Sequence, residues 1–85
     1  PKYRPFKDLS ELANYLDAHD LHLVGKILNY RNKKNRQEYI GMISGVSLSD
    51  NRIFLNGWNF SLKDLFYNFE WWNGDKWISF GVLEE

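Results

Sequence analysis

The sequence predicts an α+β fold in which a strongly coiled antiparallel sheet, or a small SH3-like barrel of about four strands, is covered by two helices. Three observations predict this fold. Two segments carry apolar residues at helical spacing behind a polar capping residue. Two further segments, separated by a polar loop, have apolar residues with a period near two, and a last segment of alternating residues follows an Asn-Gly turn. Three consecutive antiparallel strands joined by tight turns exclude a doubly wound α/β sheet.

Length and composition predict one small domain. The chain has 85 residues, so we treat 1–85 as a single unit. Aromatic residues make up 18% of it, and because each large ring can bury about 150–250 Å², a small core can be adequate. The sequence has no cysteine, which excludes disulfides and thiolate-bound zinc and suits a reducing cytosol. No apolar stretch has the length of a membrane-spanning helix, so we expect a cytoplasmic protein without membrane contact.

The first helix is predicted to begin near Asp8. The spacing of Asp8 and Glu11 is that of a capping box, in which the Asp8 carboxylate accepts a hydrogen bond from the Glu11 backbone and Glu11 reaches back. A single apolar stripe follows at i, i+3, i+4 and i+7, and it consists of Leu9, Leu12, Ala13 and Leu16. The helix is expected to fade around residues 18–20.

A hairpin is predicted next. Residues 21–30 have a period near two and form a strand, residues 31–36 form its polar tip, and residues 38–48 form the return strand. Gly41 and Gly45 are the expected bulge or bend points, because glycine lets a strand coil tightly.

Two further strands are predicted in the second half of the chain. Residues 53–55 form the third strand, which Asn56-Gly57 breaks or bulges before Trp58. Asn73-Gly74 is a strong turn signal, and residues 77–83 alternate as the final strand.

The second helix is predicted to begin after Ser61. The Ser61 side chain caps it, and Asp64 lies three residues on, where a carboxylate suits the positive end of a helix. The apolar stripe repeats the spacing of the first helix and consists of Leu62, Leu65, Phe66 and Phe69.

Charge is balanced in total and uneven along the chain. Eleven basic and eleven acidic residues give a net charge of zero, which argues against a dedicated duplex-DNA-binding protein. Basic residues cluster at the predicted hairpin tip, where Lys33, Lys34 and Arg36 follow Arg31. Such a run is typical of a solvated loop, and it is also a candidate binding site for an anionic ligand.

No motif predicts metal binding or catalysis. Asp17, His19, Asp20 and His22 are metal-binding residue types, but helical spacing points His19 away from the two aspartates, so we expect a polar helix end without metal or cofactor. The sequence has no nucleophile elbow, no phosphate-binding glycine loop and no His-Glu-x-x-His motif. We therefore expect no catalytic residues and no enzyme activity.

Aromatic side chains are the best candidates for a binding site, and these are Trp58, Tyr67, Trp71, Trp72 and Trp77. Because Trp71 and Trp72 are adjacent, one of their rings must face away from the core in either a helix or a strand. Tyr67 lies off the helical stripe and is expected to be exposed. Exposed Trp and Tyr are enriched in binding hot spots, and packing over an open barrel end or in a dimer seam is the alternative role.

Several motifs occur in a recognisable order. The chain opens with Tyr3-Arg4-Pro5-Phe6 and a capped helix, continues through a basic hairpin to the helical segment 62–69, and carries Gly81-Val82 near its last residues. This order resembles a group of small proteins from phages and prophages. The group commonly ends in Asp-Gly-x-Pro-Cys-Gly-Val, whereas residues 73–82 here contain neither proline nor cysteine. The resemblance implies an accessory phage-type protein in the cytoplasm of a bacterial host.

Two functions follow as hypotheses. The first is a non-enzymatic protein-binding module that inhibits a host or anti-phage defence component, since small phage proteins of this kind often act by binding and blocking another protein. The alternative is a nucleic-acid or nucleotide-ligand binder that uses Lys33, Lys34 and Arg36, because bases stack on aromatic rings and cations follow phosphates. Homo-oligomerisation is open as well, since the apolar surface is generous for so small a core.

Overall fold

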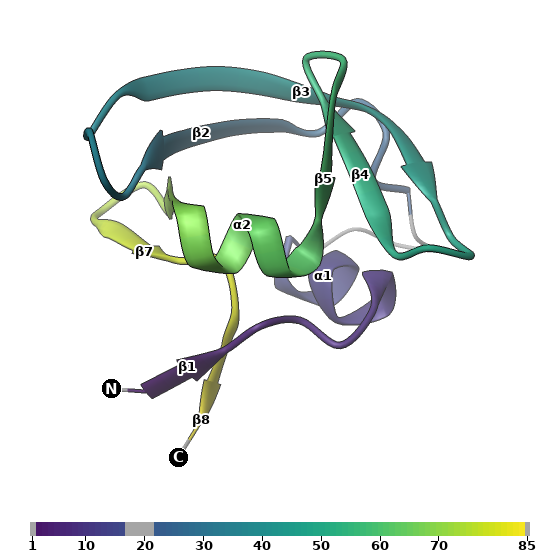
Figure 1. Cartoon of the computed structure of the whole chain (residues 1–85), viewed down its shortest axis with the longest axis horizontal. Coiled ribbons are helices and arrows are strands. Elements are labelled where there is room, and N and C mark those ends of the chain that lie inside the picture. The colour runs from purple at the N-terminus through teal and green to yellow at the C-terminus, as the bar shows by residue number, and fades with distance from the viewer. Residues whose placement is uncertain (1, 17–21, 85) are drawn as a thin grey trace.

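The computed structural model describes residues 2–16 and 22–84, which form a six-stranded antiparallel sheet, a two-stranded ribbon and two short helices. The main sheet has the order β5-β4-β3-β2-β6-β7, with β2 Ile27–Asn32, β3 Glu38–Ser47, β4 Arg52–Leu55, β5 Trp58–Ser61, β6 Phe69–Trp72 and β7 Trp77–Ser79. The ribbon pairs β1 Lys2–Arg4 with β8 Val82–Glu84. The helices are α1 Leu9–Tyr15 and α2 Leu62–Asn68. Both lie on the same side of the long β2–β3 hairpin, and the sheet curls around them (Figure 1), which confirms the predicted α+β class.

The described residues form eight strands, whereas about four were predicted. One reason is the turn at Asn56-Gly57, where both residues have left-handed backbone angles (φ 51° and 81°). This is the conformation of a two-residue hairpin turn, so β4 and β5 are separate strands that pair through Leu55 and Trp58. The expected break of the strand at Asn56-Gly57 is confirmed, but the separate strand β5 after it was not expected; Asn and Gly tolerate positive φ and here reverse the chain.

The second helix is capped as predicted but ends earlier. Ser61 Oγ accepts a hydrogen bond from the Asp64 backbone (3.1 Å), and the Asp64 carboxylate accepts one from the Ser61 backbone (3.3 Å). Phe69 is extended (φ −134°, ψ 159°) and begins β6, so it does not continue the helical stripe. It pairs with Asn32 of β2, and its ring meets Tyr30 edge-on with centroids 5.5 Å apart. Cross-strand aromatic packing therefore outweighs the helical spacing at this position.

The first helix begins as predicted. The Asp8 carboxylate accepts a hydrogen bond from the Glu11 backbone at 3.1 Å, and the whole stripe is buried, namely Leu9, Leu12, Ala13 and Leu16. The Glu11 carboxylate does not return to Asp8 as expected. It accepts a hydrogen bond from the Lys7 backbone at 2.7 Å and binds the Arg4 guanidinium at two points, 2.9 and 2.8 Å, a strong bidentate geometry. The expected fading of the helix at 18–20 lies outside the described residues.

Glycines shape the β2–β3 hairpin. The strand expected over 21–30, whose first residue lies outside the described part, begins only at Ile27, because Gly25 (φ 97°) turns the chain just before it. In β3 the pairing register shifts between Ile43 and Gly45, which confirms the predicted bulge at Gly45.

The final strand, expected over 77–83, is interrupted at Phe80 and Gly81. Phe80 is fully buried in the core, and Gly81 passes so close to the Arg4 carbonyl oxygen that no Cβ would fit there without movement. The chain therefore leaves the main sheet after β7 and enters the ribbon as β8.

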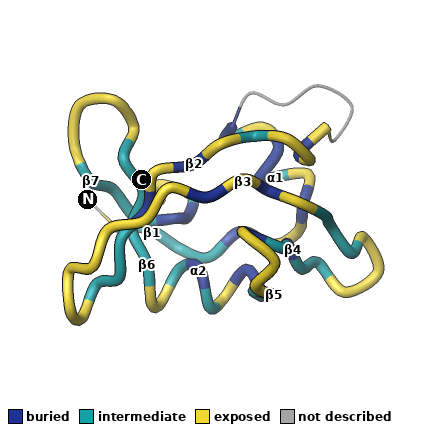
Figure 2. Tube along the Cα trace, turned by 90° about the horizontal axis from the view of Figure 1, so that it is seen from above, coloured by how far each residue is buried: buried dark blue, intermediate teal, exposed yellow. Residues whose placement is uncertain are grey.

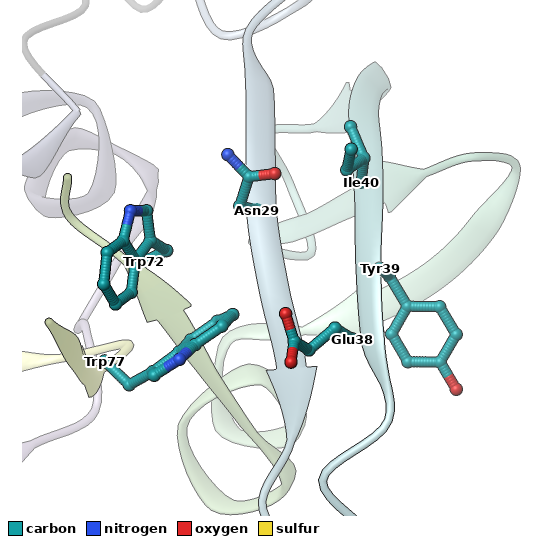
Figure 3. A pocket seen from close by; sticks show the side chains of 6 residues that line it. All are labelled: Asn29, Glu38, Tyr39, Ile40, Trp72 and Trp77. Carbon is teal, nitrogen blue, oxygen red and sulfur yellow. The ribbon is translucent and has the colours of Figure 1, made fainter.

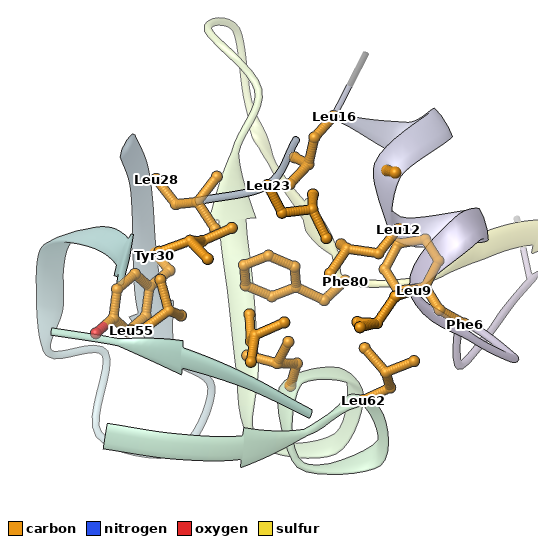
Figure 4. Close-up of a cluster of buried hydrophobic side chains, with 14 residues drawn as sticks. Phe6, Leu9, Leu12, Leu16, Leu23, Leu28, Tyr30, Leu55, Leu62 and Phe80 are labelled. Carbon is orange, nitrogen blue, oxygen red and sulfur yellow. The ribbon is translucent and has the colours of Figure 1, made fainter. Parts of the chain in front are cut away.

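The core lies between the inner face of the sheet and the two helices. Phe80 lies near its centre (Figure 4), and the other buried apolar side chains are Phe6, Leu9, Leu12, Ala13, Leu16, Leu23, Leu28, Tyr30, Ile43, Ile53, Leu55, Leu62 and Leu65. Along β2 buried and exposed residues alternate (Figure 2), so this strand has one face in the core and one face outside. Neither of the two described helices has the length and apolar character needed to cross a membrane.

We expect Gly81→Ala to lower the free energy of unfolding by about 2 kcal/mol, because the new Cβ would overlap the Arg4 carbonyl oxygen and approach Phe66 Cδ1 at 2.8 Å. Gly45→Ala is the matched control. Its Cβ would lie 3.6 Å from the Phe54 ring, an ordinary contact, so we expect a change within about 0.5 kcal/mol. Urea unfolding followed by tryptophan fluorescence measures both variants, and equal losses would contradict this explanation of the strand break.

The pair of Arg4 and Glu11 predicts that stability depends on pH. Hydrogen bonds from the Arg4 guanidinium and the Lys7 backbone lower the pKa of Glu11 from 4.5 to about 2. Because the folded state favours the charged carboxylate, this contribution is complete above about pH 4.5 and is lost as the pH falls toward 2. Glu11→Gln should therefore be less stable than the wild type near neutral pH and should lose less additional stability across that acidic range.

Urea midpoints across the acidic range measure this effect. Asp75→Asn, in an exposed turn, is the control and should keep the pH dependence of the wild type. An acid-induced loss in Glu11→Gln as large as that of the wild type would show that the pair does not act on stability.

Candidate functional site

The outer face of the main sheet, which points away from the core, carries apolar side chains. The register of the β2–β3 hairpin places Ile27 opposite Met42 and Asn29 opposite Ile40. The side chains of Ile27, Ile40 and Met42 are 68%, 71% and 47% exposed. A solvent-facing strand of an antiparallel sheet usually carries polar residues at such positions, so this face is unusual.

Two tryptophans extend the same face over β6 and β7. Trp72 and Trp77 are cross-strand partners, and their rings meet edge to face with centroids 5.4 Å apart. The turn between them is the predicted one. The Asn73 side-chain oxygen accepts backbone hydrogen bonds from the two residues after Gly74, both at 2.8 Å, and Gly74 has a φ of 102°. We call this surface the outer face, defined by Ile27, Ile40, Met42, Trp72 and Trp77.

A cavity of about 740 Å³ lies on the outer face, lined by Asn29, Glu38, Tyr39, Ile40, Trp72 and Trp77. Figure 3 shows the two indoles on one side of β2 and Ile40 on the other, while the Tyr39 ring points away from the tryptophans. The volume falls within the range of about 300–1,000 Å³ that is common for ligand sites. Glu38 is the one formally charged side chain of this lining. The cavity therefore suits an apolar group with a nearby polar contact.

Arg31 holds the tryptophan side of the outer face in place. Its Nε donates a hydrogen bond to a Glu70 carboxylate oxygen at 2.8 Å, and its guanidinium carbon lies 4.6 Å from the centre of the Trp77 ring, within cation–π distance. Arg36 is a second and looser partner, with Nη1 3.8 Å from the same Glu70 oxygen. The charges of Arg31 and Glu70 thus border the apolar surface and orient Trp77.

Trp71 faces the other way, as expected for one of two adjacent tryptophans. Its Nε1 donates a hydrogen bond to the Tyr15 hydroxyl, which in turn donates to the Ser79 carbonyl oxygen at 3.1 Å. The Trp71 ring also stacks on Phe80 with centroids 6.3 Å apart. Burial raises the pKa of Tyr15 to about 12, so its phenol is neutral at physiological pH. The structure therefore places Trp71 in packing contacts with the core.

Trp58 and Tyr67 are exposed but lie away from the outer face. Trp58, on β5, is 71% exposed and lines a second and smaller cavity. Tyr67, on α2, is exposed as predicted, and its ring meets Phe66 edge-on. Of the five aromatic residues predicted as binding residues, the structure thus brings together only Trp72 and Trp77 on one surface.

The basic hairpin tip is partly engaged within the protein. Lys33 Nζ donates a hydrogen bond to the Phe66 carbonyl oxygen at 2.8 Å and lies 5.1 Å from the centre of the Phe66 ring. Arg36 lies near Glu70, as described above, and Lys34 is exposed. The tip therefore does not present three independent cations to an anionic ligand.

The metal-type residues form no described site. Asp17, His19 and Asp20 lie outside the described residues, and His22 is exposed. Within residues 2–16 and 22–84, no group of three or more His, Cys, Asp or Glu side chains is placed to hold a metal ion.

Sequence reasoning missed the aliphatic half of the outer face, Ile27, Ile40 and Met42. A signal was present, because large apolar residues occupy consecutive positions in both strands of the hairpin, as in 27–28 and 42–43. A strand with one solvated face would alternate between apolar and polar residues instead.

Comparisons of the chain with protein-family models, curated proteins and solved structures give no match.

We expect a double-mutant cycle of Arg31→Met and Glu70→Gln to give a coupling energy of about 1 kcal/mol, because this ion pair is short and mostly shielded from solvent. The cycle of Arg36→Met and Glu70→Gln is the matched control. Arg36 is mostly exposed and its charge is 3.8 Å away, so we expect at most about 0.3 kcal/mol. Urea unfolding at low and high salt measures both cycles. Equal couplings would show that Arg31 does not fix the border of the outer face.

Proposed function

We propose that the protein is a non-enzymatic binding module of phage type, which inhibits a host or anti-phage defence protein in the bacterial cytoplasm. The observation that carries the proposal is the outer face, where exposed aliphatic side chains lie on the same sheet surface as the paired indoles of Trp72 and Trp77. Contiguous exposed apolar patches on a protein mark interaction sites. As part of this proposal we assign the curled sheet to the SH3-like barrels.

The chemistry of the outer face suits a protein partner. Trp and Arg are the residue types most enriched in binding hot spots, and here Trp77 has Arg31 above its ring and Trp72 against its edge. Anchors that are ordered before binding lose less side-chain entropy in the complex. The charges of Arg31, Glu38 and Glu70 supply a polar border around the apolar centre, as is typical of protein interfaces.

The alternative function, binding of nucleic acid or of a nucleotide ligand, has less support. Its candidate cations were Lys33, Lys34 and Arg36, of which Lys33 is bound to the Phe66 carbonyl oxygen and Arg36 lies near Glu70. The net charge of zero also provides little of the electrostatic attraction that dominates nucleic-acid affinity.

The test is affinity purification from bacterial host lysate, followed by titration of the purified partner. We expect the double variant Ile27→Thr/Ile40→Thr and the single variant Trp72→Ala to weaken binding at least about tenfold, because each removes apolar area from the centre of the outer face. Threonine keeps the β-branched shape that strands favour. The wild-type protein should bind its partner with a defined stoichiometry.

Val24→Thr and Leu48→Thr are matched controls, because both residues are exposed and apolar but lie outside the strands that form the outer face. They should bind like the wild type. Sedimentation of the free protein is the second control. A wild-type dimer that becomes monomeric in Ile27→Thr/Ile40→Thr would show that the outer face binds a second copy, and equal losses in all variants would refute a role of this face.

A further inference from the structure

A second cavity opens on the inner side of the curled sheet. The ligand proposed for it does not depend on the function proposed for the outer face. The cavity measures about 280 Å³ and is lined by Tyr30, Tyr39, Asn56, Trp58, Phe60 and Phe69. These residues come from β2, β3, the β4–β5 turn, β5 and β6. We call this cavity the aromatic groove. Its volume is just below the range of about 300–1,000 Å³ of pockets that hold drug-sized ligands, so it fits one small chemical group.

The rings of the aromatic groove are fixed by contacts with one another. Tyr30 and Tyr39 stack with centroids 5.2 Å apart and an angle of 23° between their planes. Phe69 meets Tyr30 edge-on at 5.5 Å, and Phe60 meets Phe69 edge-on at 5.3 Å. Tyr30 and Tyr39 are thus nearly parallel, whereas Phe69 and Phe60 stand at steep angles to their neighbours, so the rings that line the cavity hold one another in place. Trp58, whose ring is mostly exposed, is the lining residue with most freedom to close on a ligand.

The polar side chains of the groove differ in whether they already have hydrogen-bond partners within the protein. Both ends of the Asn56 side chain are engaged, because its oxygen accepts a hydrogen bond from the Met42 backbone (3.3 Å) and its nitrogen donates to the Ile40 carbonyl oxygen (3.0 Å). The Tyr30 hydroxyl makes no hydrogen bond with any residue in 2–16 and 22–84, although Tyr30 is only 4% exposed. It points away from Phe80 (Figure 4), out of the core. Within these ranges no fully buried side-chain oxygen or nitrogen lacks a partner, so the Tyr30 hydroxyl reaches solvent at the groove and is free to contact a ligand there.

We propose that the aromatic groove binds a quaternary ammonium group, carried either by a small molecule such as choline or by a trimethylated lysine side chain. The face of an aromatic ring is negative and attracts cations, and recesses built of several rings are the sites that recognise quaternary ammonium. The groove contains no formally charged side chain, so no lysine or arginine of its lining competes for the rings.

The remaining chemistry of the groove agrees with this ligand. Burial raises the pKa of Tyr30 and the neighbouring Tyr39 raises it further, so the Tyr30 phenol is uncharged at neutral pH. A phenol oxygen can accept weak C–H···O contacts from the polarised methyl groups of a quaternary ammonium ion. Such an ion has no N–H to donate, which suits a lining made mostly of aromatic rings, whose one amide oxygen already accepts a hydrogen bond. An anionic ligand would find no cation in this lining.

NMR titration with choline tests the proposal, with sodium chloride at the same ionic strength as the reference. We expect upfield shifts of the choline methyl signals, because the methyl groups lie over ring faces, together with shifts of the Trp58 indole signal. The neutral tert-butyl analogue of choline, in which carbon replaces nitrogen, should bind at least about fivefold more weakly, because it keeps the shape and loses the charge. Equal binding of the two would overturn the proposal.

Substitutions locate the site. Trp58→Ala should weaken choline binding at least about fivefold, and because Trp58 is mostly exposed, the variant should keep the fold. Trp58→Phe should restore part of the affinity, whereas Trp72→Ala and Tyr67→Ala should bind choline like the wild type. Loss of binding in Trp72→Ala with none in Trp58→Ala would place the cation on the outer face and overturn the proposal.

A pair of peptides distinguishes the two sources of the group. A peptide with a trimethylated lysine should bind more tightly than the same peptide with unmodified lysine if the ligand is a protein side chain. Choline binding without this preference indicates a small molecule. Failure of both choline and the methylated peptide to bind would refute the proposal and would leave the outer face, which lies on the other side of the sheet, untouched.

Discussion

Burial of Phe80 is the constraint on which the arrangement of this protein depends. Its ring lies fully buried near the centre of the core, and Gly81 then lets the backbone pass directly against the Arg4 carbonyl oxygen and the Phe66 ring. The chain can therefore leave β7 of the main sheet and pair with β1 as β8. One ring thus links α1, the main sheet and the ribbon to a common core, which matters in a chain of 85 residues that has little interior to share.

Because both helices cover the same side of the β2–β3 hairpin, the core uses only one face of it. The outer face keeps Ile27, Ile40 and Met42 in water, although covering apolar surface would gain about 25 cal/mol for each Å². This placement is unfavourable in an isolated domain and favourable in one that works by association. The aromatic groove lies on the inner side, so the two proposed sites can act separately.

The parts of the fold that depend on a few neighbouring residues were predictable from the sequence. The caps at Asp8 and Ser61 are examples, since the bonds they make lie within one helical turn. Phe69 has helical spacing too, but its pairing with β2 decides its conformation, and the sequence does not show this pairing. In the site, Trp72 was predicted as a binding residue, whereas Ile40 was missed, because its place beside the indoles depends on the register of four strands.

The ribbon has a consequence for the order of folding. It pairs Lys2 with Glu84, close to the two ends of the described chain, through strands of three residues each. Most other pairs in the main sheet join consecutive strands across short turns, such as β2–β3 and β4–β5. Closing a long loop costs more entropy than closing a short one, and three residue pairs offset little of that cost before the core exists. Local hairpins are therefore expected to form early, and the ribbon to close last.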